Sequence, residues 1–140
     1  MIIRFDEQFR LPAAEVGAYF ATPADWTRLF GLAPNPRELG DGWYEVGLKR
    51  FPFPLVARNT EHEPGRMARW VFRGFWRGRG EVRLTETGDG VRVEGFEEIA
   101  VRYLFFLSPL VEKLLLERGF RAIWAVGWYR LHKRETDPGG

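Results

Sequence analysis

The sequence has no cysteine and a single serine, and these absences exclude several kinds of chemistry. Without cysteine there is no disulfide, no thiolate zinc site and no cysteine nucleophile. A Ser-His-Asp triad would need Ser108, but its place before Pro109 predicts a helix cap instead. The two histidines, His62 and His132, lie on different predicted elements and lack metal-ligand spacing. We therefore expect no catalytic triad, no metal site and no cofactor.

The sequence also has no long hydrophobic run and no strong excess of one charge. Its most apolar stretch, residues 103–116, is interrupted by Ser108-Pro109 and Glu112-Lys113, so it is too short to cross a bilayer. The first residues show no signal-peptide pattern, and the expected location is the cytoplasm. The net charge is only +2 and the arginines are dispersed, so we expect no nucleic-acid partner.

Aromatic residues, in contrast, are abundant: they make up 16% of the chain, with 6 Trp and 12 Phe. Side chains of this size are mostly buried on folding, either in a core or around a ligand. A length of 140 residues suits one domain with a core of its own. We predict a single domain over residues 1–136 and a disordered tail over residues 137–140.

The spacing of apolar residues predicts an α+β fold. Apolar and polar side chains alternate from Ile2 to Arg10, which is typical of a strand. Pro12 and the pair Thr22-Pro23 each mark the start of a short helix, and Ser108-Pro109 starts a long one that ends near residue 134. Between them we expect antiparallel strands at residues 43–49, 55–62, 67–74, 80–87 and 91–103, with residues 75–80 as an exposed turn.

Consecutive hairpins form a meander, and a meander has one face that a helix can cover. The expected architecture is therefore a curved antiparallel sheet of six or seven strands, with two short helices and one long C-terminal helix. The segments that match a known family are residues 5–9, Leu11-Pro12-Ala13-Ala14-Glu15-Val16, Thr22-Pro23-Ala24-Asp25-Trp26 and the helix around residues 120–133.

On these segments the chain resembles the START-like superfamily, also known as Bet v 1-like or SRPBCC, whose members have the helix-grip fold. The resemblance covers nearly the whole chain and rests on element order and these short segments. It implies a cavity for a lipid, sterol-like molecule, polyketide or quinone between the sheet and the last helix. Some branches, the polyketide cyclase-like ones among them, are enzymes, so the resemblance predicts a fold more specifically than a function.

Glu97 is the main candidate for a polar group in such a cavity. Along residues 91–103 the odd positions are mostly apolar, which predicts that they face inward and places Glu97 on the cavity wall. A lone carboxyl there would hydrogen-bond a ligand hydroxyl, or exchange a proton at a raised pKa. Two other interpretations are open: a β-bulge near Gly95 that shifts the register, and a structural ion pair with an arginine.

Apolar side chains on the strands and the last helix complete the predicted ligand-binding site, because pocket walls are mostly apolar. The full set is Tyr44, Trp70, Phe72, Val82, Leu84, Val93, Glu97, Phe120, Trp124 and Trp128. The same rings also suit a close-packed core, and a fully packed core would leave no cavity.

Three functions follow from these observations. The first is a binding protein, monomeric or homodimeric, that holds a hydrophobic or amphipathic small molecule in the cavity. The second is an enzyme of the cyclase or dehydratase kind that uses Glu97, Tyr44 or Tyr103 for proton transfer. The third is an interaction module with no open cavity, which binds a protein, RNA or membrane surface through its arginine-rich rim.

Overall fold

The predicted order of strands and helices is confirmed, with one strand, β2, in addition. The computed structural model describes the chain apart from residues 31, 50, 52, 102–108 and 137–140, and apart from the side chains of residues 109–113. In chain order the elements are β1 (Ile2–Phe9), α1 (Ala13–Ala18), the 3-10 helix η1 (Asp25–Arg28), β2 (Arg37–Gly40), β3 (Trp43–Val46), β4 (Leu55–Glu63), β5 (Met67–Arg73), β6 (Trp76–Glu86), β7 (Val91–Val101) and α2 (Pro109–Thr136).

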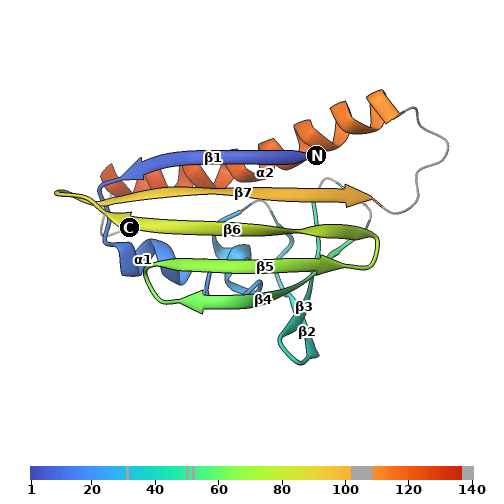
Figure 1. Cartoon of the computed structure of the whole chain (residues 1–140), viewed down its shortest axis with the longest axis horizontal. Coiled ribbons are helices and arrows are strands. Elements are labelled where there is room, and N and C mark those ends of the chain that lie inside the picture. The colour runs from blue at the N-terminus through green and yellow to red at the C-terminus, as the bar shows by residue number, and fades with distance from the viewer. Residues whose placement is uncertain (31, 50, 52, 102–108, 137–140) are drawn as a thin grey trace.

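The seven strands form one antiparallel sheet in the order β1-β7-β6-β5-β4-β3-β2 (Figure 1). Strands β2 to β7 are a meander, and β1 pairs with β7 from Ile2 opposite Glu98 to Phe9 opposite Val91. The longest ladder joins β6 and β7, from Trp76 opposite Val101 to Glu86 opposite Val91. The prediction of an α+β fold with a curved sheet of six or seven strands is therefore confirmed, at seven strands.

Helix α2 runs along one face of the sheet beside β1 and β7, and α1 and η1 lie on the same side (Figure 1). On β1, the Phe5 ring stacks on Trp124 of α2 at 4.5 Å between ring centroids, and Phe9 lies 6.0 Å from Trp128. Leu131, near the end of α2, is fully buried. The core therefore lies between the inner face of the sheet and this layer of helices.

Residues 75–80 are the main correction to the predicted elements, because β6 begins at Trp76 and not at residue 80. Gly74, with φ of 91°, supplies the turn. The Trp76 side chain faces inward, is buried, and donates a hydrogen bond from Nε1 to the Phe53 carbonyl at 3.0 Å. Gly78 and Gly80 are strand residues: a Cβ on Gly78 would lie 1.8 Å from the Glu98 carbonyl oxygen. These glycines permit close packing of the strands, although in the sequence alone their pattern resembles that of a turn.

Two smaller differences concern short elements. The second short helix is only the single 3-10 turn η1, which begins at Asp25 with Ala24 as its N-cap, so the predicted start at Thr22-Pro23 is wrong. Thr22 lies just before it, and its hydroxyl and backbone N–H donate to the Asp25 carboxylate at 2.9 and 3.0 Å. Strand β2 was not predicted, because its four residues are all exposed and show no apolar alternation. The predicted cap at Ser108, the end of the last strand near residue 103 and the tail at 137–140 lie outside the described residues.

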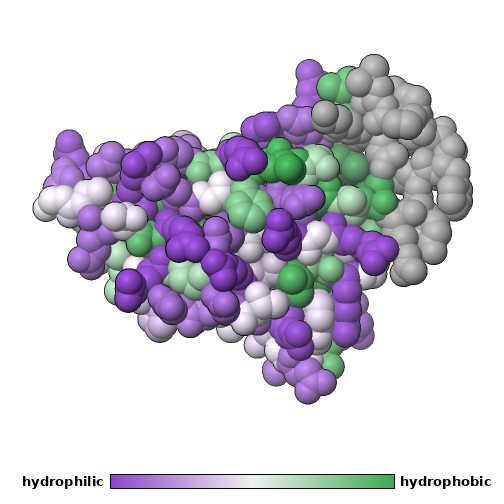
Figure 2. Space-filling model, viewed as in Figure 1, coloured by the Kyte–Doolittle hydropathy of each residue, from purple (hydrophilic) through white to green (hydrophobic). Residues whose placement is uncertain are grey.

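The outer face of the sheet is predominantly charged (Figure 2). Glu81 on β6 accepts from Arg69 of β5 at 2.6 Å and from Arg83 at 3.2 Å. Arg92 on β7 bonds Asp6 of β1 at 2.7 Å. The Arg69–Glu81 and Arg92–Asp6 pairs join neighbouring strands, whereas Arg83 and Glu81 both belong to β6. The inner face carries the apolar side chains. Among the described helices, none has the length and apolar content needed to span a membrane.

Candidate functional site

Glu97 faces the core. The β6–β7 register runs without a shift through Gly95, so the alternative of a β-bulge there is wrong, and Val93 and Ile99 are buried on the same side of β7. The side chain of Glu97 is 7% exposed, and it is the single buried charged residue in the described part of the chain. The predicted inward direction of Glu97 is therefore correct.

A row of cross-strand neighbours places an indole beside this carboxyl. Glu97 on β7 pairs with Gly80 on β6, and Gly80 pairs with Trp70 on β5. A Cβ on Gly80 would lie 2.2–2.4 Å from three atoms of the Trp70 ring, with Nε1 at 2.3 Å. The indole thus lies on Gly80, in the space that any other side chain would fill, and extends toward Glu97.

A second indole reaches Glu97 from the helix layer. Trp124 of α2 stacks on Phe5 and meets the Phe30 ring edge-to-face at a centroid distance of 4.7 Å. Phe30 in turn lies against the backbone of Gly127, where a Cβ would be 2.4 Å from its ring. The missing side chain at Gly127 lets α2 approach the η1 segment closely and fixes Trp124 over the sheet.

Hydrogen bonds hold the connecting segments that close this region. Asn59 of β4 donates from Nδ2 to the carbonyls of Phe20 and Ala21, both at 2.8 Å. Arg130 of α2 donates from Nη1 to the Leu29 carbonyl at 2.9 Å. Both side chains donate to backbone carbonyls that accept no hydrogen bond within a helix. These bonds hold the aromatic residues around η1 in position.

Burial raises the pKa of Glu97 from its ordinary value of 4.5 to about 7, because the charged form loses its hydration. The neighbouring Trp124 and Trp70 indoles act in the opposite direction and lower the pKa, but they do not offset the burial. No ion pair to Glu97 forms among the described residues, so the structural-pair interpretation finds no partner there. Below about pH 7 the folded protein therefore favours a protonated Glu97.

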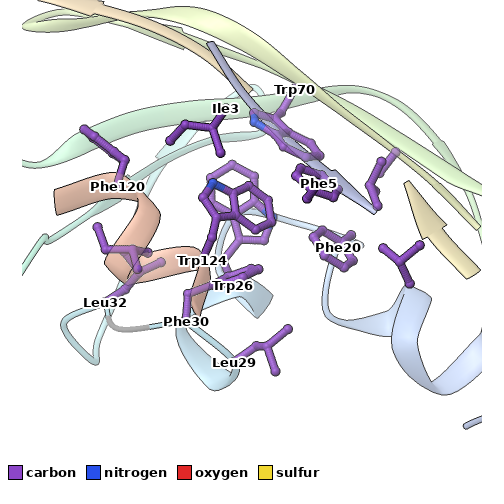
Figure 3. Close-up of a cluster of buried hydrophobic side chains, with 14 of the residues drawn as sticks. Ile3, Phe5, Phe20, Trp26, Leu29, Phe30, Leu32, Trp70, Phe120 and Trp124 are labelled. Carbon is purple, nitrogen blue, oxygen red and sulfur yellow. The ribbon is translucent and has the colours of Figure 1, made fainter. Parts of the chain in front are cut away.

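Glu97 lines a small cavity between the sheet and the helices, and Figure 3 shows the rings of Trp26, Trp70 and Trp124 gathered there. The lining residues are Phe20, Trp26, Phe30, Leu32, Leu48, Leu55, Trp70, Glu97, Phe120, Ile123 and Trp124. The volume of this cavity, counted as the space that the centre of a water molecule can occupy, is about 30 Å³. One water needs about 10–15 Å³ on this measure, and a pocket for a drug-sized ligand spans about 300–1,000 Å³. The aromatic side chains therefore fill most of the region.

Two residues that line this cavity each have a buried N–H group without a partner in the described part of the chain. Trp70 is 1% exposed and Trp26 is 5% exposed, and the Nε1 atom of each makes no hydrogen bond with the described residues. Trp70 Nε1 lies near the Glu97 carboxyl without reaching hydrogen-bond geometry. The two rings meet edge-to-face at 5.4 Å between centroids. Unpaired buried donors are rare in proteins, and they mark a place where something polar is expected to bind.

The structure brings four of the ten predicted ligand-binding residues to the cavity: Trp70, Glu97, Phe120 and Trp124. The other six lie outside its lining. Val82, Leu84 and Val93 are buried in the core on the sheet side, Phe72 is buried beside Trp26, and Tyr44 and Trp128 are half-buried at the margin of the core. Their contact with a ligand stays a prediction, and it would require a larger cavity than this one.

Seven lining residues were not among the predicted site residues: Phe20, Trp26, Phe30, Leu32, Leu48, Leu55 and Ile123. Most come from the segments between α1 and β4, whose place over the sheet depends on long-range contacts such as the Leu32–Leu48 bridge. These segments are rich in aromatic residues and adjoin the short helices expected at one end of the sheet. That was the sequence signal that could have placed them at the site. Of the predicted acid-base tyrosines, Tyr44 is away from the cavity and Tyr103 lies outside the described residues.

The same fold occurs in proteins of very different sequence. No protein-family model matches this chain, and no curated protein matches it. Its structure is similar to that of XoxI from Bacillus cereus, at 10% identity and a TM-score of 0.73 over 99% of this chain and 98% of that one. The Aha1 dimer from Colwellia psychrerythraea has 10% identity and a TM-score of 0.69 over 100% and 99% of the two chains. At these identities the likeness establishes the fold, an antiparallel sheet with a C-terminal helix, and leaves the ligand open.

Proposed function

We propose that this protein binds a hydrophobic or amphipathic small molecule between the sheet and α2, and that Glu97 is its polar contact. The observation that carries the proposal is a buried carboxyl that faces an aromatic cavity and has no ion-pair partner in the described structure. A pKa near 7 means that burying the Glu97 carboxylate costs about 3 kcal/mol at alkaline pH. A core built only for stability would favour an apolar side chain at this position.

The small volume of the cavity requires side chains to move when a ligand binds. Phe51 provides one such ring: it stacks on Phe120 at 5.2 Å and covers Gly119 of α2, where a Cβ would be 2.3 Å from the ring. Phe120 lines the cavity. A ring that packs on a glycine can withdraw without breaking a hydrogen bond, so we place ligand entry between Phe51 and α2.

A fluorescence titration with the neutral apolar dye N-phenyl-1-naphthylamine tests this proposal. We expect saturable binding to the wild-type protein, and its loss in Leu55→Phe, which fills the cavity. The matched control is Val56→Phe, the next residue on β4, which faces away from the cavity lining and should keep wild-type binding. Absence of saturation, or equal binding by a folded Leu55→Phe variant, contradicts the proposal and favours a filled core that acts only through its surface.

A second candidate function is proton transfer within the same cavity, and the pKa of Glu97 near 7 favours it. A carboxyl that titrates close to the operating pH is suited to act as a general acid or base. Ring opening of 5-nitrobenzisoxazole is a suitable probe, because a base removes the ring C–H proton, the electron pair forms the nitrile and the N–O bond breaks to a phenolate. We expect a rate that rises with pH through about 7 and disappears in Glu97→Gln; an unchanged rate in that variant rejects this function.

Membership of the START-like superfamily belongs to the same proposal. It is supported by the element order and by the likeness to XoxI and Aha1 over nearly the whole chain. The Aha1 structure is that of a dimer, and we include a homodimer among the expected states of this protein. Sedimentation equilibrium across a range of concentrations distinguishes a dimer from a monomer.

A further inference from the structure

The cavity carries hydrogen-bonding groups that the fold itself does not satisfy, and their chemistry restricts what binds there. An indole N–H is a donor only and cannot accept a hydrogen bond. Trp70 and Trp26 both line the cavity, and each has a buried N–H that no described residue accepts. Glu97 adds a hydroxyl donor when it is protonated. All three groups can therefore be satisfied by the same kind of atom, a hydrogen-bond acceptor.

The rest of the lining makes an acceptor more suitable than a cation. The remaining lining residues are aliphatic or aromatic, so a cation would lose its hydration without gaining an acceptor other than Glu97. An ammonium group would face indole N–H edges that carry positive partial charge. Burial also favours the neutral form of Glu97, which does not form an ion pair.

We infer that the ligand presents a neutral acceptor oxygen, a ketone or aldehyde carbonyl, to the N–H groups of Trp70 and Trp26 and to the carboxyl of Glu97. This inference rests on the proposed binding function and names the chemical class of the polar end. The existing space of about 30 Å³ suits a head group of this size, and the apolar remainder of the ligand takes the place of the rings that move.

Four probes of one shape and different polar groups test the inference: acetophenone, 1-phenylethanol, ethylbenzene and 1-phenylethylamine. The measurement is a titration followed by the indole N–H signals in ¹⁵N-resolved NMR spectra, with each signal assigned from its Trp→Phe variant. We expect acetophenone to bind about tenfold more tightly than ethylbenzene, a difference of about 1.4 kcal/mol. It should also shift the Trp70 and Trp26 N–H protons downfield, and 1-phenylethylamine should bind most weakly.

Variants then test which N–H donors cause the preference for acetophenone over ethylbenzene. Trp70→Phe and Trp26→Phe keep an aromatic ring but remove the donor, so the ratio of acetophenone to ethylbenzene affinity should fall in each. Trp128→Phe is the matched control, because Trp128 lies outside the cavity lining, and its ratio should stay at the wild-type value. The probe series and the N–H shifts in the wild-type protein decide the matter even if a tryptophan variant does not fold.

The outcomes separate this inference from the proposed function. Equal binding of acetophenone and ethylbenzene overturns the inference and leaves the binding function standing; it is the result expected if buried water already satisfies the two indoles. Tightest binding by 1-phenylethylamine overturns it in favour of a cation held by the Glu97 carboxylate and the rings. Absence of saturable binding by all four probes overturns the proposed function and the inference together.

Discussion

The indole nitrogen of Trp70 lies 2.3 Å from the point where a Cβ on Gly80 would stand, so these two residues fit together only because Gly80 has no side chain. Their strands are adjacent, and Glu97 is the next residue in the same cross-strand row. The glycine on β6 thus makes room for the ring that reaches the buried carboxyl on β7. This relationship is the structural basis of the site.

Gly80→Ala should therefore displace the Trp70 ring. The new methyl group meets three ring atoms at 2.2–2.4 Å, and the ring is fully buried and cannot turn away freely. We expect the free energy of unfolding to fall by about 2 kcal/mol, as for other overpacked cores. Chemical denaturation measures the change. Gly88→Ala is the control, because a Cβ there has no atom within 4 Å, and an equal loss of stability in that variant would refute the explanation.

The raised pKa of Glu97 predicts a pH dependence of stability with a definite sign. Between pH 4.5 and about 7 the folded state holds a proton on Glu97 that the unfolded state has released, so stability falls as the pH rises through this range. Glu97→Gln removes the effect. Relative to the wild-type protein, this variant should gain up to about 3 kcal/mol at pH 8 and much less at pH 4.5.

Urea unfolding at several pH values measures this difference. Glu98→Gln is the matched control, since its side chain is the outward neighbour of Glu97 and pairs with Arg79 at 3.5 Å on the surface. It should show no gain of stability at pH 8. A Glu97→Gln variant whose stability relative to the wild-type protein does not change with pH would show that Glu97 is not a buried, raised-pKa carboxyl.

Binding of a carbonyl probe should depend on pH through the same group. Protonated Glu97 donates to the carbonyl oxygen, whereas the carboxylate has no proton to donate. The dissociation constant of acetophenone should therefore be constant below about pH 6 and rise above the Glu97 pKa of about 7 to a plateau no more than about tenfold higher, where only the indoles still donate. Titration of Glu97→Gln, whose amide keeps a donor, should give a flat profile. A flat wild-type profile is the contradicting result.

Gly119→Ala tests the packing of Phe51 on α2. An alanine in a helix interior is favoured over glycine by about 1 kcal/mol, but here the Cβ would lie 2.3 Å from the Phe51 ring. The steric cost should exceed the gain, and we expect a net loss of about 1 kcal/mol in the free energy of unfolding. Ala125→Gly, at an exposed position of the same helix, calibrates the helix propensity alone. A net stabilisation in Gly119→Ala would mean that Phe51 moves aside at no cost.

The fold could be predicted because its signals are local. The alternation along β7 was enough to predict that Glu97 faces inward, and Pro12 and Pro109 marked real helix starts. Strand β2 carried no apolar alternation. The start of β6 could not be recognised, because the same glycines that suggest a turn permit close strand packing in the sheet.

The site was harder to predict because it depends on registers and on segments far apart in the sequence. No local pattern shows that Trp70 lies two strands away from Glu97, or that Gly80 separates them. The positions of Leu32, Leu48 and Leu55 over the cavity depend on how the segments between α1 and β4 close the end of the sheet. The volume of the cavity follows from the packing of all these rings, which a sequence pattern does not specify.

The most direct test of the central claim, that the space between the sheet and α2 holds an apolar small molecule, is native mass spectrometry of the purified protein. The measurement is followed by denaturing extraction and identification of what is released. We predict a stoichiometric adduct with a carbonyl-bearing apolar compound, which is lost in the cavity-filling Leu55→Phe variant and kept in Val56→Phe. A clean unliganded mass, together with no saturable binding of N-phenyl-1-naphthylamine, would contradict the claim.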